Sequence, residues 1–265
     1  MIDRLAGLAR GRTIVALTGA GCSTESGIPD YRSDGAPKRT PMQHREFVDR
    51  ADARRRYWAR SLVGWPALAT TRPNAAHRAL AALEERGALA GVITQNVDGL
   101  HGAAGSRSVV ELHGALARVR CLVCEIIISR AKYQERLLAA NPSWRTRDAA
   151  LAPDGDAELL DLPDFAVAPC AACGGVVMPD VVFFGGSVAR ATLDAAWALF
   201  DRGELLLVAG TSLAVFSGYR FVRRAHERGV PVAIVNRGPT RGDDHAAVKI
   251  DANVGDVLPA LTAAL

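Results

Sequence analysis

The chain has 265 residues, of which 49% are hydrophobic and 23% are charged. This balance is typical of a globular protein that buries a sizeable core. The formal net charge is +4 at pH 7, but acidic and basic residues are mixed along the chain, which argues against a nucleic-acid-binding stripe. We expect the mild positive charge to help attract an anionic cofactor. The nearest basic run predicts a solvated helix face and comprises Arg54, Arg55, Arg56 and Arg60.

The first ten residues contain no long apolar run, and a strand-like segment begins at Ile14. This leaves little room for a targeting peptide, and no segment is apolar over the length needed to span a bilayer. We therefore expect a cytoplasmic protein that acts as a monomer, without a membrane anchor or a nucleic-acid partner.

Short apolar runs alternate with helical patterns along the chain. The predicted strands are Ile14–Leu17, Val92–Thr94, Val109–Glu111, Leu205–Ala209, Val232–Val235 and Val248–Ile250. The predicted helices between them include Ala75–Glu85, Ala191–Phe200 and Gly218–Glu227. Apolar strands separated by helices favour an α/β fold with a doubly wound, Rossmann-like parallel sheet.

The middle of the chain interrupts this rhythm. Two cysteine pairs lie between residues 121 and 173, with a polar stretch around residues 141–162. Such a long loop is usually functional or mobile. We predict one catalytic domain over residues 1–265. Its large Rossmann-like part covers approximately 1–37, 73–115 and 178–265, and its small zinc-binding and helical module covers approximately 38–72 and 116–177.

The first chemical motif directly follows the strand at Ile14–Leu17 and reads GAGCSTESGIPDYR over residues 19–32. Glycines after a strand let backbone N–H groups approach a pyrophosphate, and a following helix start favours its negative charge. Thr24 replaces the third glycine of a dinucleotide fingerprint, so the glycines alone could equally form a structural turn. The hydroxyls of Ser23 and Ser26, with the acid, aromatic ring and base at 30–32, favour a cofactor site.

Two further motifs also follow predicted strands. TQNVDGLH at 94–101 offers amide and carboxylate groups that suit a ribose and a carboxamide, although an Asx-rich turn explains the spacing equally well. ELHG at 111–114 places His113 at the same sheet edge. Imidazole, with a reference pKa near 6.5, is the natural general base at neutral pH, whereas a lone histidine is more often structural.

The cysteines form two C-x-x-C pairs and one separate residue. The metal ligands that we predict are Cys121, Cys124, Cys170 and Cys173. Four thiolates close a tetrahedral zinc site and leave no position for a catalytic water, so the zinc would be structural. A redox dithiol is the alternative. Cys22, in the glycine motif, is expected to be a small buried apolar residue.

Small polar clusters also follow two strands near the C-terminus. Gly210-Thr211-Ser212 follows Leu205–Ala209, and Asn236-Arg237-Gly238 follows Val232–Val235. Each alone would pass for a loop. Together with the first motif they outline one extended cofactor crevice suited to adenosine and ribose.

The ordered motifs resemble the sirtuin family over nearly the whole chain, from about Ile14 to Pro259. Besides the motifs above, the resemblance rests on PDVVFFGG at 179–186, GTSLAVFSGYRF at 210–221 and NRGPT at 236–240. Within the family the chain is most similar to the class II branch that contains the mitochondrial sirtuin 4 type. The segments that indicate this branch are PDYRS at 29–33, RYWAR at 56–60, GWP at 64–66, NPSW at 141–144, LAPDGD at 151–156 and GPTRGDD at 238–244.

The resemblance implies NAD-dependent removal of acyl groups from protein lysines, with nicotinamide released and the acyl group transferred to ADP-ribose. It implies His113 as proton acceptor, with Asn96 and Asp98 in the catalytic set. The cofactor-binding residues implied are Gly19, Ala20, Gly21, Ser23, Thr24, Ser26, Gly27, Ile28, Asp30, Tyr31, Arg32, Gln95, Asn96, Val97, Asp98, His113, Gly210, Thr211, Ser212, Asn236, Arg237, Gly238 and Val254.

The resemblance also implies that an acyl-lysine peptide adds as a strand between residues 182–186 and 213–216. The substrate residues are then Val182, Phe184, Gly185, Val215 and Phe216, while Gly186 stands where the family usually has an acidic residue. The segment 34–41, rich in glycine and proline, is expected to cover the site.

Tyr57 and Arg60 lie three residues apart on a predicted helix. They resemble the pair that recognises acidic acyl groups in desuccinylating sirtuins, which predicts a preference for longer or carboxylated acyl groups. A surface helix with an aromatic anchor is the alternative. Two other functions share the NAD pocket, namely mono-ADP-ribosyl transfer and NAD sensing without catalysis.

Overall fold

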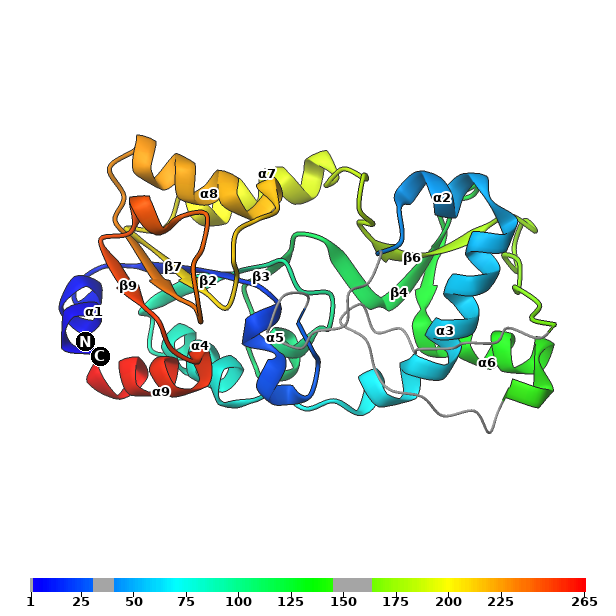
Figure 1. Ribbon diagram of the computed structural model, residues 1–265, viewed down its shortest axis with the longest axis horizontal. Helices are drawn as coiled ribbons and strands as arrows, with labels where there is room; N and C mark the ends of the chain where they lie inside the picture. Colours follow the sequence, from blue (N-terminus) through cyan, green and yellow to red (C-terminus); the bar gives the residue numbers. More distant parts are fainter. Residues whose placement is uncertain (1, 31–40, 145–163) are drawn as a thin grey trace.

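The computed structural model describes residues 2–30, 41–144 and 164–265 and shows an elongated molecule with a large and a small lobe (Figure 1). Tyr31, Arg32 and most of the segment expected to cover the site lie outside these residues. Both chain termini lie at the far end of the large lobe. Within the described residues, no helix combines the length and apolar character needed to cross a membrane.

The large lobe is built on a parallel sheet of six strands in the order β3-β2-β1-β7-β8-β9. When these six strands are renumbered 1 to 6 along the chain, the order is 3-2-1-4-5-6, as in a doubly wound nucleotide-binding fold. The strands are β1 (Ile14–Thr18), β2 (Leu89–Thr94), β3 (Val109–Glu111), β7 (Leu205–Ala209), β8 (Val232–Val235) and β9 (Val248–Ile250). The order reverses between β1 and β7, which pair in register from Ile14↔Leu205 to Thr18↔Ala209. Such a switch point is where open α/β sheets bind ligands.

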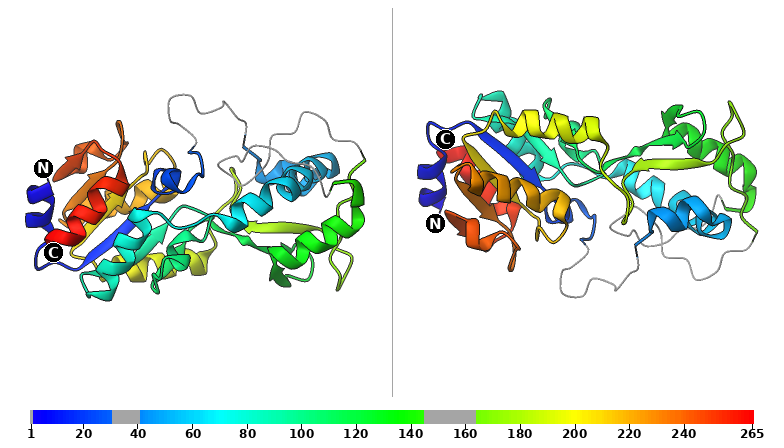
Figure 2. Two further views of the ribbon diagram at one scale, coloured as in Figure 1. Left: turned by 90° about the horizontal axis from the view of Figure 1, so that it is seen from below. Right: turned by 90° about the horizontal axis from the view of Figure 1, so that it is seen from above.

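Helices cover both faces of this sheet (Figure 2). One face packs on α1 (Ile2–Ala9), α4 (Ala75–Glu85) and α9 (Val254–Ala264), and the other on α7 (Arg190–Phe200) and α8 (Phe216–Glu227). The short α5 (Leu100–Ala103) follows β2. Buried leucine, isoleucine, valine and alanine side chains fill both layers. Because both faces are covered, β1, β2, β7 and β8 are buried at every position.

The small lobe has its own aromatic core. It contains α2 (His44–Asp49), α3 (Ala51–Thr70), α6 (Arg130–Ala140) and an antiparallel sheet ordered β5-β4-β6. Its strands are β4 (Gly114–Cys121), β5 (Ile127–Ser129) and β6 (Val177–Val181). Trp58 is fully buried and meets Tyr133 edge-on, with ring centroids 4.6 Å apart. The guanidinium of buried Arg130 lies 5.4 Å from the Trp58 ring and donates to the Ser61 carbonyl.

The chain passes from the large lobe to the small lobe between β3 of the large sheet and β4 of the small sheet. Gly114 has φ +80, and a Cβ here would collide with the carbonyl of Asp180. Only glycine combines this backbone conformation with so close an approach of β4 to β6. Val182 N–H then donates to the carbonyl of His113 at 2.8 Å. This crossing fixes the neighbouring His113 beside the segment that follows β6.

Candidate functional site

The glycine motif forms two 3₁₀ turns after β1, Ala20–Cys22 and Thr24–Ser26. It packs backbone to backbone against the end of β7, since Gly21 N–H donates to the Gly210 carbonyl at 2.8 Å. Gly210 has φ +65, and a Cβ there would collide with the backbone of Cys22. Cys22 itself is 2% exposed, as expected for a small apolar residue, and burial raises the pKa of its thiol.

A polar network ties the motif after β2 to the glycine turns. Asn96 donates from Nδ2 to the Gly19 carbonyl and to Ser23 Oγ, both at 3.0 Å. Ser23 Oγ in turn donates to Asp98 Oδ2 at 2.7 Å, and Asp98 Oδ1 accepts from the Leu100 N–H at 2.9 Å. Asp98 therefore accepts hydrogen bonds at both oxygens, as suits a carboxylate that orients its neighbours.

Gln95 bridges the network to β7. Its Nε2 donates to Thr211 Oγ1 at 3.0 Å, and its backbone N–H donates to the Thr18 carbonyl at 2.9 Å. The amide is packed so closely against α8 that a Cβ at Gly218 would come within 2.5 Å of its oxygen. The Gln95 side chain thus spans the switch point between β1 and β7.

His113 is held at both ring nitrogens. Its Nδ1 lies 2.9 Å from the Gln95 carbonyl, and its Nε2 lies 2.7 Å from Ser217 Oγ. A carbonyl can only accept, so Nδ1 carries the proton and Nε2 keeps its lone pair. Burial lowers the pKa of His113 below 6.5, against the opposing effect of the Gln95 carbonyl. A neutral imidazole that carries its lone pair on Nε2 is the form that a general base needs, and in this structure that nitrogen accepts a hydrogen bond from the Ser217 hydroxyl.

Two buried histidines lie beneath the glycine turns. His101 Nε2 lies 2.9 Å from Thr18 Oγ1, and its ring centroid lies 4.8 Å from that of His77. Burial lowers the pKa of His101 to about 3 and that of His77 to about 4. Asn74 caps α4 and donates from Nδ2 to the Cys22 carbonyl at 2.8 Å. These neutral groups support the floor of the site.

The two C-terminal motifs lie at the same edge of the sheet. Thr211 Oγ1 accepts from the Leu213 N–H at 3.2 Å, and buried Leu213 adopts φ +57. A non-glycine residue in this left-handed region is uncommon and strained. Asn236 is buried and donates from Nδ2 to the Arg237 carbonyl at 2.7 Å, while Gly238 N–H donates to Asp251. Val254 begins α9 and is buried.

The predicted substrate segments lie on either side of His113. Val182 is tied to the His113 carbonyl, and Phe184 is 40% exposed while its carbonyl accepts from His44 N–H at 2.8 Å. From the other side, Val215 and Phe216 are 38% and 44% exposed. Gly185 has φ +75. Exposed large apolar side chains beside a polar centre are typical of a binding surface.

Tyr57 and Arg60 differ in environment. Tyr57 is 2% exposed and packs edge-on against Phe47 and Phe183, with ring centroids 5.5 and 5.2 Å away. Arg60 is exposed. Through Phe183 the Tyr57 ring lies directly under the predicted substrate segment 182–186. Packing in the aromatic core is sufficient to explain Tyr57, and its predicted role in acyl recognition stays a prediction.

The four paired cysteines gather in the small lobe, at and after the end of β4 and before the start of β6. All are free thiols whose sulfurs lie within 4.8 Å of one another, with Cys121–Cys173 at 3.5 Å and Cys124–Cys170 at 3.7 Å. Tetrahedral zinc with Zn–S near 2.3 Å requires sulfurs about 3.8 Å apart. Hydrogen bonds from the backbone N–H groups of Cys124 and Val123 lower the pKa of Cys121 to about 6. The donor set fits a closed structural zinc site.

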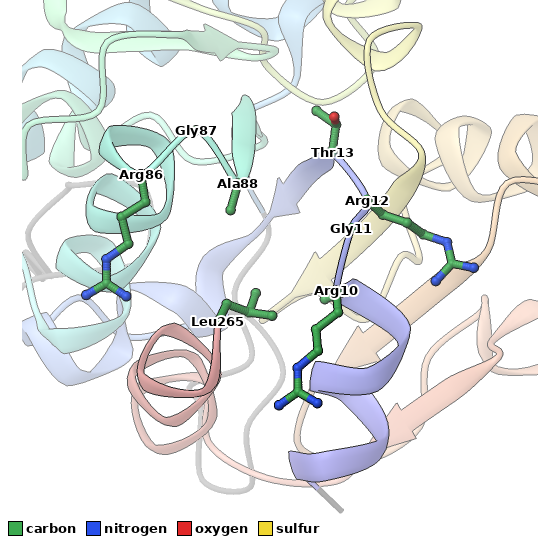
Figure 3. A pocket seen from close by; sticks show the side chains of 9 residues that line it. Arg10, Gly11, Arg12, Thr13, Arg86, Gly87, Ala88 and Leu265 are labelled. Atoms are coloured by element: carbon green, nitrogen blue, oxygen red, sulfur yellow. The ribbon is translucent and has the colours of Figure 1, made fainter.

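A separate hollow of about 320 Å³ lies at the opposite, amino-terminal edge of the sheet (Figure 3). Three arginines line it, but Arg10 donates to the Ala264 carbonyl, Arg86 to Thr262 and Arg12 to Leu8. These side chains complete the C-terminal turns of α9 and α1. The hollow is not part of the site.

Comparison with known proteins identifies the family. The family model described as the Sir2 family matches residues 19–217. The chain is also 53% identical over 256 residues to NAD-dependent protein deacetylase 1 of Mycobacterium avium (strain 104), covering 95% of this chain and 91% of that protein. The chain belongs to the Sir2 family. It is 48% identical over 255 residues to NAD-dependent protein deacylase Sirt4 of Drosophila melanogaster, covering 94% of this chain and 82% of that protein.

Solved structures agree with this membership of the Sir2 family. A Sir2 complex with a p53 peptide and NAD+ superposes with a TM-score of 0.77 at 30% identity, covering 97% of this chain and 95% of that one. Sir2 bound to acetylated peptide gives a TM-score of 0.78 at 29% identity with the same coverage. The expected sirtuin fold, with its parallel Rossmann-like sheet and cysteine module, is confirmed.

Several residues of this Sir2 site could not be recognised as site residues from the sequence. Ser217 contacts the basic nitrogen of His113, but it stands at the start of α8, one residue after the predicted peptide-binding segment 213–216, and was given no role from the sequence. His77 and His101 are single histidines outside any metal spacing, and they meet because α4 and α5, which flank β2 in the chain, pack against each other. Thr18 ends β1, one residue beyond the strand predicted from the sequence, and lies between that strand and the glycine motif.

Proposed function

We propose that this chain is an NAD-dependent protein-lysine deacylase that transfers the acyl group to ADP-ribose and releases nicotinamide. The observation that carries the proposal is the fixed tautomer of His113, whose basic Nε2 lies at the carboxyl edge of the sheet between the cofactor crevice and the substrate segment. Relatives named as NAD-dependent deacetylases and deacylases, and the solved complexes with NAD and acetylated peptide, support it.

The residues present fit NAD. Backbone N–H groups of the glycine turns follow β1 at the switch point, where a pyrophosphate binds in doubly wound folds. Ser26 Oγ is buried and lacks a hydrogen-bond partner among the described residues. Such an orphaned hydroxyl is costly unless a ligand satisfies it. When bound, NAD would supply a ribose carbon with a nicotinamide leaving group, and ribose hydroxyls from which a proton must be removed.

The side chains at and around His113 would carry out proton transfer, orient the cofactor and limit access of water. His113 Nε2 accepts the proton, and the Gln95 carbonyl holds the imidazolium that forms through Nδ1–H. Asn96 and Asp98, locked by Ser23, present an amide and a carboxylate to the ribose and the carboxamide. The buried floor limits the water that would otherwise hydrolyse NAD.

A peptide substrate would add as a strand between residues 182–186 and 213–216. The exposed Phe184, Val215 and Phe216 offer apolar contacts along this path. Main-chain hydrogen bonds would bind the peptide with little dependence on its sequence, while the acyl-lysine side chain enters toward His113. The aromatic core under Phe183 then forms part of the surroundings of the acyl group.

We further propose placement in the class II, Sirt4-like branch, with a preference for longer or carboxylated acyl groups, including lipoyl. The Drosophila deacylase supports the branch, and the Tyr57 and Arg60 pair supports the acyl preference. A monomeric state and a cytoplasmic location are part of the same proposal.

The test is product analysis by mass spectrometry with NAD and acyl-lysine peptides. O-acyl-ADP-ribose and free lysine peptide, formed in equal amounts, are the expected products. ADP-ribosylated protein without deacylation would instead indicate a mono-ADP-ribosyltransferase. NAD binding with no turnover on any peptide would indicate a sensing module, and either result would overturn the proposal.

A further inference from the structure

The outer surface of α8 carries a cluster that the cofactor and peptide sites do not use. A hollow of about 230 Å³ is lined there by Trp197, Phe216, Arg220, Arg223, Arg224 and Glu227. The residues of α8 in this set are spaced at 216, 220, 223, 224 and 227, so they share one side of the helix. We call this surface the arginine face.

Aromatic rings hold its guanidinium groups in place. Arg220 and Arg223 lie 5.2 and 5.5 Å from the ring centroid of Phe216, and Arg224 lies 5.8 Å from that of Trp197. Stacked guanidinium groups are partly desolvated and keep their in-plane N–H donors available. The arginine face is therefore a preorganised cationic surface rather than a set of freely moving side chains.

The positive charge of the arginine face is only partly neutralised. Arg223 pairs with Glu227 at 3.3 Å, whereas no carboxylate within the described ranges pairs with Arg220 or Arg224. Arg220 Nε is also buried without a hydrogen-bond partner among those residues. A buried N–H without an acceptor is unfavourable unless a ligand supplies one.

The location connects this charge to the substrate. α8 begins at Phe216, at the carboxyl edge of the sheet. The next residue, Ser217, contacts His113. Phe216 is both a predicted peptide contact and the ring on which two of the arginines stack. A peptide strand that pairs with residues 213–216 would lie beside the start of α8, where Phe216 borders the arginine face.

We propose that the arginine face selects acyl-lysine substrates with acidic residues on one flank of the modified lysine. This inference rests on the proposed deacylase function and extends it to the substrate sequence. Aspartate or glutamate side chains would accept hydrogen bonds from Arg220 and Arg224 and contact Arg223, which Glu227 already orients. Arginine forks match carboxylates bidentately, so the selection is for carboxylate geometry as well as charge.

The experiment compares binding and turnover of matched acyl-lysine peptides. One peptide carries three glutamates before the lysine, one carries them after it, and the controls carry glutamines at the same positions. Binding is measured by fluorescence anisotropy without NAD, so it is independent of catalysis. We expect one glutamate peptide to bind roughly 3- to 10-fold more tightly than its glutamine control, as for two or three partly exposed ion pairs.

The variants are Arg224→Glu with Arg223→Glu, and Arg107→Glu as the matched control. Arg107 is exposed and precedes β3, at the opposite edge of the sheet. The double variant should lose the glutamate preference and keep turnover of the glutamine peptides, while Arg107→Glu should keep both. Raising NaCl from about 0.05 to about 0.3 M should weaken the preference through screening.

Equal binding of glutamate and glutamine peptides by the wild type would overturn the inference, even with normal deacylation. Arginine-dependent binding of a single-stranded oligonucleotide, with no glutamate preference, would overturn it in favour of a nucleic-acid surface. Absence of turnover on every peptide contradicts the proposed function instead, and the anisotropy result then still decides whether the arginine face binds acidic peptides.

Discussion

At the scale of single residues, the proposed chemistry depends on how His113 is held. The hydrogen bond from Nδ1–H to Gln95 fixes the tautomer, and burial keeps the ring neutral. His113→Ala should leave the Kd for NAD nearly unchanged and lower kcat by about 10²-fold, as for loss of a general base. Isothermal titration and steady-state kinetics measure the two quantities. His226→Ala, which removes an exposed imidazole, is the control, and near wild-type turnover by His113→Ala would exclude the assigned role.

The pH profile tests the same residue in the unmodified enzyme. Because burial lowers the pKa of His113 below 6.5, the basic form predominates at neutral pH. We expect kcat/KM to be constant above pH 7 and to fall as the pH decreases below 6.5. A profile that rises through pH 7 to 8 would mean that another group limits the reaction.

The buried histidines beneath the site make a prediction about stability. The pKa values of His77 and His101 are depressed to about 4 and about 3, so the unfolded chain binds protons below pH 6.5 that the folded chain does not. Their stabilising contribution is complete above pH 6.5 and is lost progressively on acidification. Each can remove up to about 1.4 kcal/mol per pH unit. Tm should therefore fall between pH 7 and pH 5.

A variant separates these histidines from other titrating groups. His101→Gln should reduce the slope of Tm against pH, and His226→Gln, at an exposed position, should keep the wild-type slope. An unchanged slope in His101→Gln would show that its titration does not control stability in this range.

At the scale of elements, α3 carries the test of acyl choice. Tyr57 is packed against Phe183 while Arg60 is exposed, so the two side chains differ in environment, and a carboxylated acyl group would have to reach the Arg60 guanidinium in solvent. We compare kcat/KM on acetyl, succinyl, glutaryl, hydroxymethylglutaryl and lipoyl peptides. Arg60→Met should lower the rates on the carboxylated groups about 10-fold or more and leave acetyl unchanged, because a bidentate carboxylate contact is lost. If acetyl is the best substrate, or if Arg60→Met changes nothing, both residues are structural.

The elements differ in how far sequence predicts them. The buried strands β7 and β8 read as continuous apolar runs and have the predicted bounds, as do the short edge-side strands β3 and β9. α4 begins where Asn74 caps it, as predicted. In contrast, β4 mixes arginines with apolar residues and pairs with β6 across the long cysteine-containing segment. Local periodicity contains no information about such a distant partner. α9 includes Pro259 and was not predicted as a helix.

The residues of the candidate site also differ in how far the sequence predicts them. Motifs at strand ends could be found because parallel strands bring their carboxyl ends to one edge. Ser217, His77 and His101 could not, since each contributes through a contact with a residue distant in sequence. The arginine face likewise becomes visible only when α7 places Trp197 beside α8.

At the scale of the whole molecule, the two lobes have separate cores and divide the site between them. The large lobe supplies the switch point, the glycine turns and His113, while the small lobe supplies the aromatic cluster under the predicted substrate segment. A small cluster around Ile28, Leu68, Leu100 and Leu116 lies where they meet. We therefore expect NAD binding and peptide turnover to respond differently to loss of the small lobe.

Cys170→Ser tests this division through the zinc site. Removing one thiolate from a closed four-thiolate site should release the metal and destabilise the small lobe, because zinc binding contributes directly to folding. Cys170 is 6% exposed and belongs to the aromatic core of that lobe, so the loss should spread to α3 and β6. We expect less than one zinc per chain by metal analysis, a new low-temperature unfolding transition, and a fall in peptide turnover of about 10-fold or more while the Kd for NAD changes little. Cys22→Ala, which alters the one cysteine outside the cluster, should keep its zinc. Full zinc content in Cys170→Ser would disprove the ligand assignment, and a parallel loss of NAD binding would disprove the independence of the lobes.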